Sequence, residues 1–319
     1  MKPVAKATRH RRAFTIVELL TVMSIIVILI GLLVPALNKV KQYATNVKQK
    51  AQFHSIEAAL ELFDSQFGGY PDSSYSPPGD TGQLGYCGAQ KLCEAMMGQD
   101  LMGFHPDSVF RSDGTALRAL ATGATVSVAL YSPSTIPARP GAFLPLENAN
   151  AYPVHQLYTQ PGNLDYRKDS LPANANWHFV LCDVYNRVTN NETGKKVGMP
   201  VLYYKANTSR QLHDLTNPNN PDNIYNWIDN AELLRLGMPF DSAARPHRLL
   251  SFAADATTGA PAETEGMRFY WNIRNDRVSS ISRPFRADSY ILISAGWDGE
   301  YGTADDICNF DWSFRDRLQ

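Results

Sequence analysis

A single carboxylate, Glu18, lies near the start of an apolar stretch that runs from Phe14 to Leu37 and carries no other charged residue. A charged side chain inside a membrane helix costs roughly 2.5–3.5 kcal/mol on insertion scales. An unpaired Glu18 would therefore only weaken membrane insertion. We expect this carboxylate to have a positively charged partner.

The nearest candidate partner is an α-amino group at Phe14, which a cut between Ala13 and Phe14 would create. Residues four apart share one face of a helix, so the new amine and Glu18 would lie on the same face. The basic leader, the small residue Ala13 and the Phe-Thr-x-x-Glu spacing before an apolar helix are similar to those of the type IV pilin and pseudopilin family.

This resemblance implies that a prepilin peptidase cuts before Phe14 and methylates the new amine, and that Glu18 meets the N-terminal amine of a neighbouring subunit during filament assembly. The family usually has Gly before the cut, whereas this chain has Ala13. Because Ala is also small, we expect slower processing at most. The implied partners are the peptidase, a membrane platform protein, an assembly ATPase, and other copies or relatives of this chain. In this family the same type of N-terminal helix serves protein secretion, DNA uptake and motility, so the resemblance does not distinguish these three functions.

Two simpler interpretations of the N-terminus compete with this one. A secretory signal peptide could end at Val34-Pro35-Ala36, but its apolar core would be at most about 15 residues, and Phe14–Ile30 is already longer. A plain signal anchor is compatible with the length, because Phe14–Leu37 would span about 36 Å against a membrane core of about 30 Å. That interpretation leaves Glu18 unexplained.

Charge around the apolar stretch predicts its orientation. The leader has no acidic residue, so it should stay in the cytoplasm and place the bulk of the chain outside the inner membrane. We expect a single-pass protein that later enters a periplasmic or extracellular filament. Lysines also follow the apolar stretch and reduce this asymmetry. The basic residues of the leader are Lys2, Lys6, Arg9, Arg11 and Arg12, and the lysines are Lys39, Lys41, Lys48 and Lys50.

Apolar residues at steps of three and four predict that the helix continues beyond Leu37 as an amphipathic element. Pro35 and Gly31 should kink or locally melt it. Gly68-Gly69 and Pro71 predict an end near Phe67. The expected stripe is Leu37, Val40, Ala44, Val47, Ala51, Ser55, Ala58 and Leu62.

The rest of the chain predicts an α+β head with a mainly antiparallel sheet, on which the N-terminal helix packs as in pilins. We expect three parts: a leader at 1–13, the helix at 14–67, and an extracytoplasmic head at 68–319. Segments 131–169 and 208–261 should be long loop insertions. Expected helices are 89–97 and 116–121, and expected strands are 125–131, 178–185, 201–205, 267–273 and 290–294.

A second cluster of candidate ligands follows the last expected strand, where Asp298, Asp305 and Asp306 share one Gly-rich turn. Calcium takes carboxylate and backbone carbonyl oxygens, and Gly lets the backbone curl so that carbonyls point inward. The spacing is not that of an EF-hand. It resembles the C-terminal calcium loop of the major type II secretion pseudopilin, which ends in an Ile and an Asn-aromatic pair, here Ile307 and Asn309-Phe310.

The alternative for this turn is an Asx-rich hairpin loop without metal. If calcium is bound, either Asp305 or Asp306 could face it.

Four cysteines, Cys87, Cys93, Cys182 and Cys308, would lie on the oxidising side of the membrane, where three full pairings are possible. Cys93 falls within an expected helix, where a buried thiol is equally compatible.

Composition gives little support for an enzyme or a nucleic-acid binder. The net charge is −1, no basic run follows Lys50, and no His-Glu-x-x-His pair, Gly-x-Ser-x-Gly elbow or phosphate loop is present. We therefore expect a structural filament subunit rather than an enzyme. The alternative is a minor tip subunit or a membrane-tethered protein whose large head captures a ligand.

Overall fold

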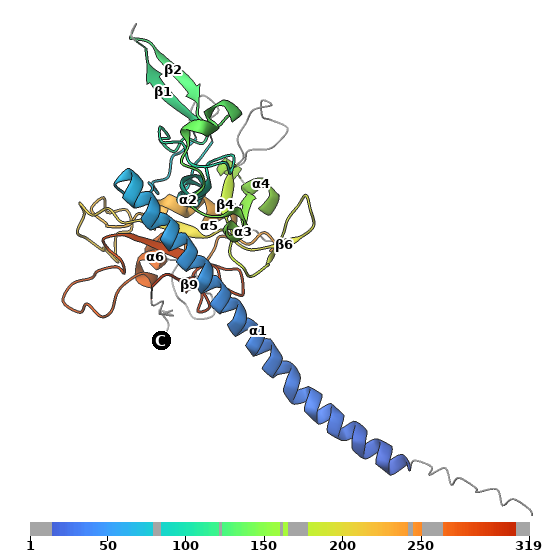
Figure 1. The fold of residues 1–319 in the computed structure, drawn as a ribbon. Coiled ribbons are helices and arrows are strands. Elements are labelled where there is room, and N and C mark those ends of the chain that lie inside the picture. The colour runs from blue at the N-terminus through green and yellow to red at the C-terminus, as the bar shows by residue number, and fades with distance from the viewer. Residues whose placement is uncertain are drawn as a thin grey trace, which may run out of the picture. The chain divides into compact units, whose positions relative to one another are not determined.

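A computed structural model describes residues 15–78, 84–120, 123–159, 162–164, 178–241, 245–250 and 264–310. The chain divides into two compact units, 1–45 and 46–319. Helix α1, Ile16–Phe67, contributes residues to both units (Figure 1).

Helix α1 is continuous through Pro35, so the expected local melting of the helix is wrong. A proline ring inside a helix clashes with the carbonyl of the residue four positions earlier, which here is Gly31. A glycine at that position gives the backbone freedom to tilt its carbonyl away. The helix ends at Phe67 as predicted, and Gly68 follows with a φ of 74° and an N–H that donates to the Asp64 carbonyl at 2.7 Å.

The buried face of α1 differs from the expected one. Phe53, Ile56, Leu60 and Phe63 are buried, and the other buried residues of the helix are Gln49, Gln52 and Ala59. Val47 and Leu62 of the expected stripe are 50% and 58% exposed. Both sets recur at steps of three and four. The larger aromatic and aliphatic side chains remove more apolar surface from water, so their face packs against the head.

The central sheet of the head contains β7 (Leu202–Lys205), β8 (Tyr290–Ser294) and β9 (Ile307–Cys308), all antiparallel. Successive strand residues point to opposite faces. Accordingly Tyr203 and Leu292 pack in a core with the buried face of α1, whereas Tyr204 and Ile291 pack in a second core. Helix α2 (Gly88–Met97) contributes to both cores and is buried throughout.

The other described strands form small antiparallel pairs rather than one extended sheet. β1 (Thr115–Ala119) pairs with β2 (Thr125–Ala129), β3 (Ala151–Pro153) with β4 (Phe179–Leu181), and β5 (Val188–Thr189) with β6 (Lys196–Val197). The α+β class with antiparallel strands is therefore confirmed, as are helix α2 and strands β2, β7 and β8. The single sheet is replaced by several short ones.

Two secondary-structure predictions are wrong. The expected helix at 116–121 lies mostly in β1, and the expected strand at 267–273 is helix α6 (Met267–Asn272). β1 is determined by its antiparallel pairing with β2, the next element along the chain. α6 is rich in aromatic residues, but it begins directly after the left-handed Gly266, and Phe269 and Tyr270 are buried in the second core.

The segments expected as long insertions contain short elements of their own. These are η1 (Pro133–Ala138), α3 (Leu146–Ala149), α4 (Val154–Leu157), η2 (Gly162–Leu164), η4 (Trp227–Asn230) and α5 (Ala231–Leu236), where η marks a 3₁₀ helix.

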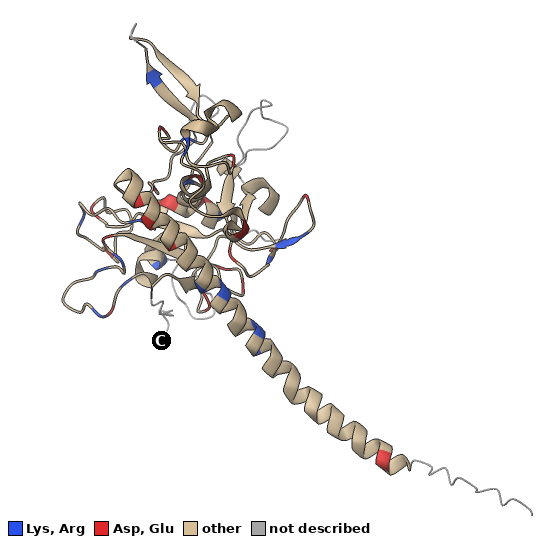
Figure 2. Ribbon diagram, in the orientation of Figure 1, with Lys and Arg blue, Asp and Glu red and all other residues tan. Residues whose placement is uncertain are grey.

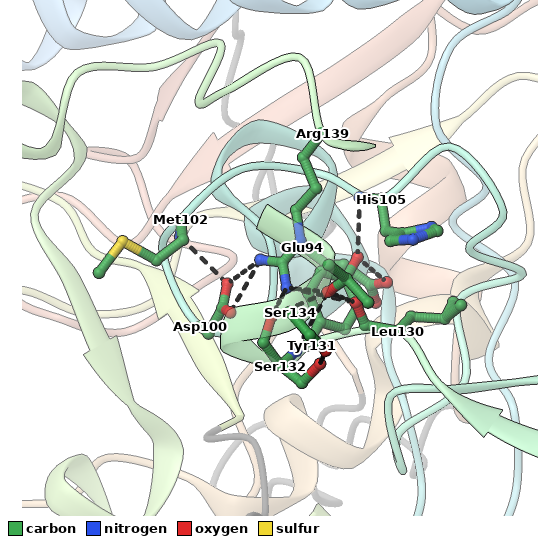
Figure 3. A network of polar contacts seen from close by, with 10 residues as sticks. Glu94, Asp100, Met102, His105, Leu130, Tyr131, Ser132, Ser134 and Arg139 are labelled. Atoms are coloured by element: carbon green, nitrogen blue, oxygen red, sulfur yellow. Dashed lines mark hydrogen bonds and ion pairs between the residues drawn. The ribbon is translucent and has the colours of Figure 1, made fainter. Parts of the chain in front are cut away.

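A buried polar network fixes the base of the β1–β2 hairpin (Figure 3). The fully buried guanidinium of Arg139 donates to both carboxylate oxygens of Asp100, at 2.7 and 2.8 Å, and to the Leu130 carbonyl. Glu94 of α2 accepts a 2.7 Å hydrogen bond from the Tyr131 hydroxyl. The residues that follow β2 are thereby anchored to α2 and to Arg139.

Candidate functional site

The first turn of α1 forms a reciprocal capping arrangement between Thr15 and Glu18. Oε2 of Glu18 accepts hydrogen bonds from the Thr15 N–H at 2.9 Å and the Thr15 hydroxyl at 2.7 Å, and the Glu18 N–H donates to the same hydroxyl at 3.2 Å. This is the capping box that a Thr-x-x-Glu sequence favours. The expected processing residues Ala13 and Phe14 lie outside the described residues.

The carboxylate of Glu18 retains binding capacity in this arrangement. Both of its described hydrogen bonds go to Oε2, and the side chain is exposed. Thr21 does not compete for the carboxylate, because its hydroxyl donates to the carbonyls of Val17 and Glu18. Oε1 is therefore the atom through which Glu18 could meet a cationic partner.

Helix α1 contains the one stretch, among the described residues, that is long and apolar enough to cross a membrane. In Figure 2 a single acidic position marks the start of α1, and a long uncharged stretch separates it from the first basic positions. Its large apolar side chains are exposed, for example Ile25 and Leu29. By length and composition this part of α1 is a candidate membrane anchor.

The acidic turn links β8 to β9, whose pairing places Ser294 opposite Ile307. Gly296 has a φ of 65°, and a Cβ there would lie 2.2 Å from the Asp305 carbonyl oxygen, so the turn requires glycine at this position. The Asp298 N–H donates to Oδ2 of Asp305 at 2.9 Å. The backbone therefore brings two of the three predicted carboxylates together.

The carboxyl groups of Asp298 and Asp306 have different surroundings. Burial, together with the adjacent Asp305 carboxylate, raises the pKa of Asp298 to about 6. Asp306 is almost fully buried, its Oδ2 accepts the Gly302 N–H at 2.8 Å, and burial raises its pKa well above the ordinary value. Asp306 is thus held by the protein backbone, whereas Asp298 and Asp305 face each other.

The fit of this turn to a calcium ion depends on the oxygen donors that it brings together. Within the described residues, no group of three or more His, Cys, Asp or Glu side chains is arranged to hold a metal. The turn fits a calcium site with two side-chain ligands rather than three. Asp298 and Asp305 would supply the carboxylates, and backbone carbonyls would supply the remaining oxygens. A cation there would relieve the repulsion that contributes to the raised pKa of Asp298. Of the two alternatives, this geometry favours Asp305 over Asp306.

The residues after the turn have a structural role that the sequence did not reveal. Oδ1 of Asn309 accepts the Leu292 N–H at 2.9 Å, and its Nδ2 donates to Glu57 of α1 at 3.1 Å. Arg286 donates to the same Glu57 oxygen at 2.9 Å and to the Asn309 carbonyl at 2.8 Å. The end of the turn is therefore tied to α1 through Glu57.

The four cysteines are unpaired, and Cys87, Cys93 and Cys182 are buried. Burial raises the pKa of Cys93, as expected for a thiol in an apolar core. His178 and Asp183, which flank Cys182, have separate partners: His178 contacts the carbonyl of Ser112 at 2.8 Å, and Asp183 accepts the Ser294 hydroxyl at 2.8 Å.

No family model, curated protein or solved structure matches this chain.

Proposed function

We propose that this chain is a structural subunit of a type II secretion pseudopilus or a type IV pilus-like filament. A prepilin peptidase cuts between Ala13 and Phe14, the helix holds the subunit in the inner membrane with its head outside, and a platform protein and an assembly ATPase insert it into the filament. The observation that carries this proposal is Glu18, an acid at the start of an exposed apolar helix with one carboxylate oxygen still available.

Cleavage before Phe14 would place a new cation beside this carboxylate. The capping contacts occupy Oε2, so Oε1 can receive the N-terminal amine of a neighbouring subunit. Such a pair inside a membrane or a filament core fixes axial register, because breaking it leaves an uncompensated charge.

The two faces of α1 support lateral assembly. Phe53, Ile56 and Leu60 pack against the subunit's own head, whereas Val47 and Leu62 remain exposed. An exposed apolar stripe on a helix is the surface that neighbouring helices cover in a filament. The expected stripe is thus assigned to contacts between subunits rather than within one.

Calcium completes the proposal as a structural ion held by Asp298 and Asp305, which would brace the β8–β9 turn. Bound cations supply charge neutralisation where carboxylates meet. Asp306 supports the turn from its inner side through the Gly302 N–H.

Sequencing the N-terminus of the mature chain tests the processing step. A chain that begins at N-methylated Phe14 supports the proposal, and an intact Met1 or a start near Leu37 contradicts it.

Two substitutions separate the assembly role of Glu18 from its capping role. Glu18→Gln preserves a side chain that can cap the helix but removes the charge, and we expect it to insert normally and to form no filaments. Thr15→Ala is the matched control, because it removes the two hydroxyl contacts of the cap and keeps the carboxylate. Filaments formed by Glu18→Gln at the wild-type level would show that the acid only caps the helix.

A tip subunit or membrane-tethered ligand-binding protein is the second candidate. A polar pocket beside Asp229 of η4 favours it.

A further inference from the structure

Positive charge marks the end of the apolar stretch of α1. Lys39 is the first charged residue after Glu18, so the 20 residues from Leu19 to Asn38 carry no charge. At a rise of about 1.5 Å per residue they span about 30 Å, which is the thickness of the hydrocarbon core of a bilayer. In a bilayer Lys39 would therefore lie where the hydrocarbon core ends, and Lys41 about 3 Å further along the helix.

The two lysines have no acid within reach on their own helix. No Asp or Glu occurs in α1 between Glu18 and Glu57, and ion pairs on a helix surface join residues three or four positions apart. Both lysine side chains are exposed. Figure 2 shows the uncharged stretch of α1 and the basic positions that follow it. The positive charge of this turn is thus available to an external anion.

Tyr43 lies at the same level of the helix. It is 72% exposed and follows Lys39 by four residues, so the two side chains share one face. Tyrosine is enriched at membrane–water interfaces because its ring is apolar and its hydroxyl is polar. Tyr43 is about 6 Å beyond Lys39 along the helix, and the polar headgroup layer is about 5–8 Å thick on each side of a bilayer. Lys39, Lys41 and Tyr43 therefore all fall within that layer.

The chemistry of this layer favours a lipid phosphate as the partner of the two lysines. A lysine stem can lie along apolar surface while its ammonium, a compact charge with three donors, stays among the headgroups. A zwitterionic headgroup carries its own cation, so a lipid with net negative charge is attracted more strongly. An acidic protein would reach both lysines only by displacing the headgroups that already surround them.

We propose that Lys39 and Lys41 bind the headgroup of an anionic phospholipid in the leaflet where the apolar stretch of α1 ends, with Tyr43 at the same depth. The ammonium groups donate to the phosphate oxygens. The inference rests on α1 as the membrane anchor of the proposed function, and it concerns the subunit before it enters a filament.

Native mass spectrometry of the full chain in a non-ionic detergent measures the bound lipid directly. Phosphatidylglycerol and phosphatidylcholine with identical acyl chains are added in equal amounts, so that only the headgroup differs. Each lysine near an anionic surface contributes about a fivefold gain in affinity. We therefore expect phosphatidylglycerol to be retained at least about tenfold more than phosphatidylcholine. Equal retention of the two lipids by the wild type would overturn the proposal.

Paired substitutions test the residues. Lys39→Gln with Lys41→Gln should reduce the preference to less than about threefold, whereas Lys39→Arg with Lys41→Arg retains the charge and should keep it. Lys195→Gln with Lys196→Gln is the matched control, because it removes two charges at exposed positions of the head and should behave like the wild type. If the first variant keeps the preference, or if the control loses as much, the two lysines of α1 are not the site.

Separate measurements distinguish failure of this inference from failure of the proposed function. Alkaline extraction of membranes tests the anchor, and the wild type and the Lys39→Gln/Lys41→Gln variant should both stay in the membrane, because losing positive charge after the apolar stretch increases the charge asymmetry around it. Release of the wild type would overturn the anchor and this inference together. N-terminal sequencing and filament formation report on processing and assembly, and a negative result there leaves lipid retention unchanged.

Discussion

Replacing Asp183 with Asn should stabilise the head in a pH-dependent way. Asp183 is fully buried between the end of β4 and β8. Its Oδ2 accepts the Ser294 hydroxyl at 2.8 Å, and its Oδ1 accepts the N–H groups of Tyr185 and Met199 at 3.2 and 3.0 Å. Burial nevertheless raises its pKa from 3.8 to about 7. Asn retains the shape and can donate to Ser294 in place of accepting from it.

The sign follows from proton linkage. Between pH 3.8 and about 7 the folded chain keeps a proton on Asp183 that the unfolded chain has lost, so the contribution of this group to stability falls as pH rises through that window. Its destabilising effect is about 2 kcal/mol at pH 5 and about 4 kcal/mol at pH 8.5, because each unit of pKa shift corresponds to about 1.4 kcal/mol. Asp183→Asn should therefore gain roughly 2–3 kcal/mol more at pH 8.5 than at pH 5.

Urea denaturation of wild type and variant at both pH values measures this difference. Other acids with raised pKa values are present in both proteins, so they cancel in the comparison. Asp222→Asn, at an exposed position, is the control and should show the same change at both pH values. An Asp183→Asn effect that is equal at pH 5 and pH 8.5 would refute the reasoning.

Three further perturbations test other parts of the head. Gly198→Ala should destabilise it by at least about 2 kcal/mol, because an added Cβ would lie 2.0 Å from the Asp183 carbonyl oxygen; unchanged urea denaturation would contradict this. Arg139→Met should cost about 3 kcal/mol in the same assay by leaving the Asp100 carboxylate without its buried partner, and a loss below about 1 kcal/mol would show that solvent replaces the ion pair. A calcium chelator should lower the thermal midpoint of the wild type by several degrees and leave Asp305→Asn unchanged, whereas an unchanged wild-type midpoint argues against a structural ion.

Elements with a strong local pattern could be predicted from the sequence. The continuous apolar stretch and Gly68 determine α1 and its end, and short, largely apolar runs determine β7 and β8. The face of α1 that packs could not be selected, because the Val47–Leu62 stripe and the Phe53–Phe63 stripe share one period. β1 was assigned incorrectly because its pairing with β2 in a hairpin decides it, and α6 because a buried environment built by residues distant in sequence decides it.

The candidate sites also differ in how far a local sequence pattern could predict them. Glu18 and its cap lie within one helical turn, and the Thr-x-x-Glu pattern that predicts the capping box is visible in the sequence. The pairing of Asp298 with Asp305 depends on backbone curvature at Gly296, which the spacing alone does not define. Asp229 and Arg210 line one cavity because residues 72–74, the end of β7 and η4 border the same space, so no local motif could indicate that cavity.

The cap and the proposed salt bridge at Glu18 are compatible uses of one carboxylate. Thr15 takes Oε2 through its backbone and its hydroxyl, which orients the side chain toward the helix start while the leader is still attached. Cleavage before Phe14 retains Thr15 and adds a cation at that same end of the helix. The acid is then oriented before its partner exists, so pairing loses little side-chain entropy. In the proposed filament, preorganisation by Thr15 would offset the cost of placing this acid in a membrane helix by favouring its salt bridge at the subunit contact.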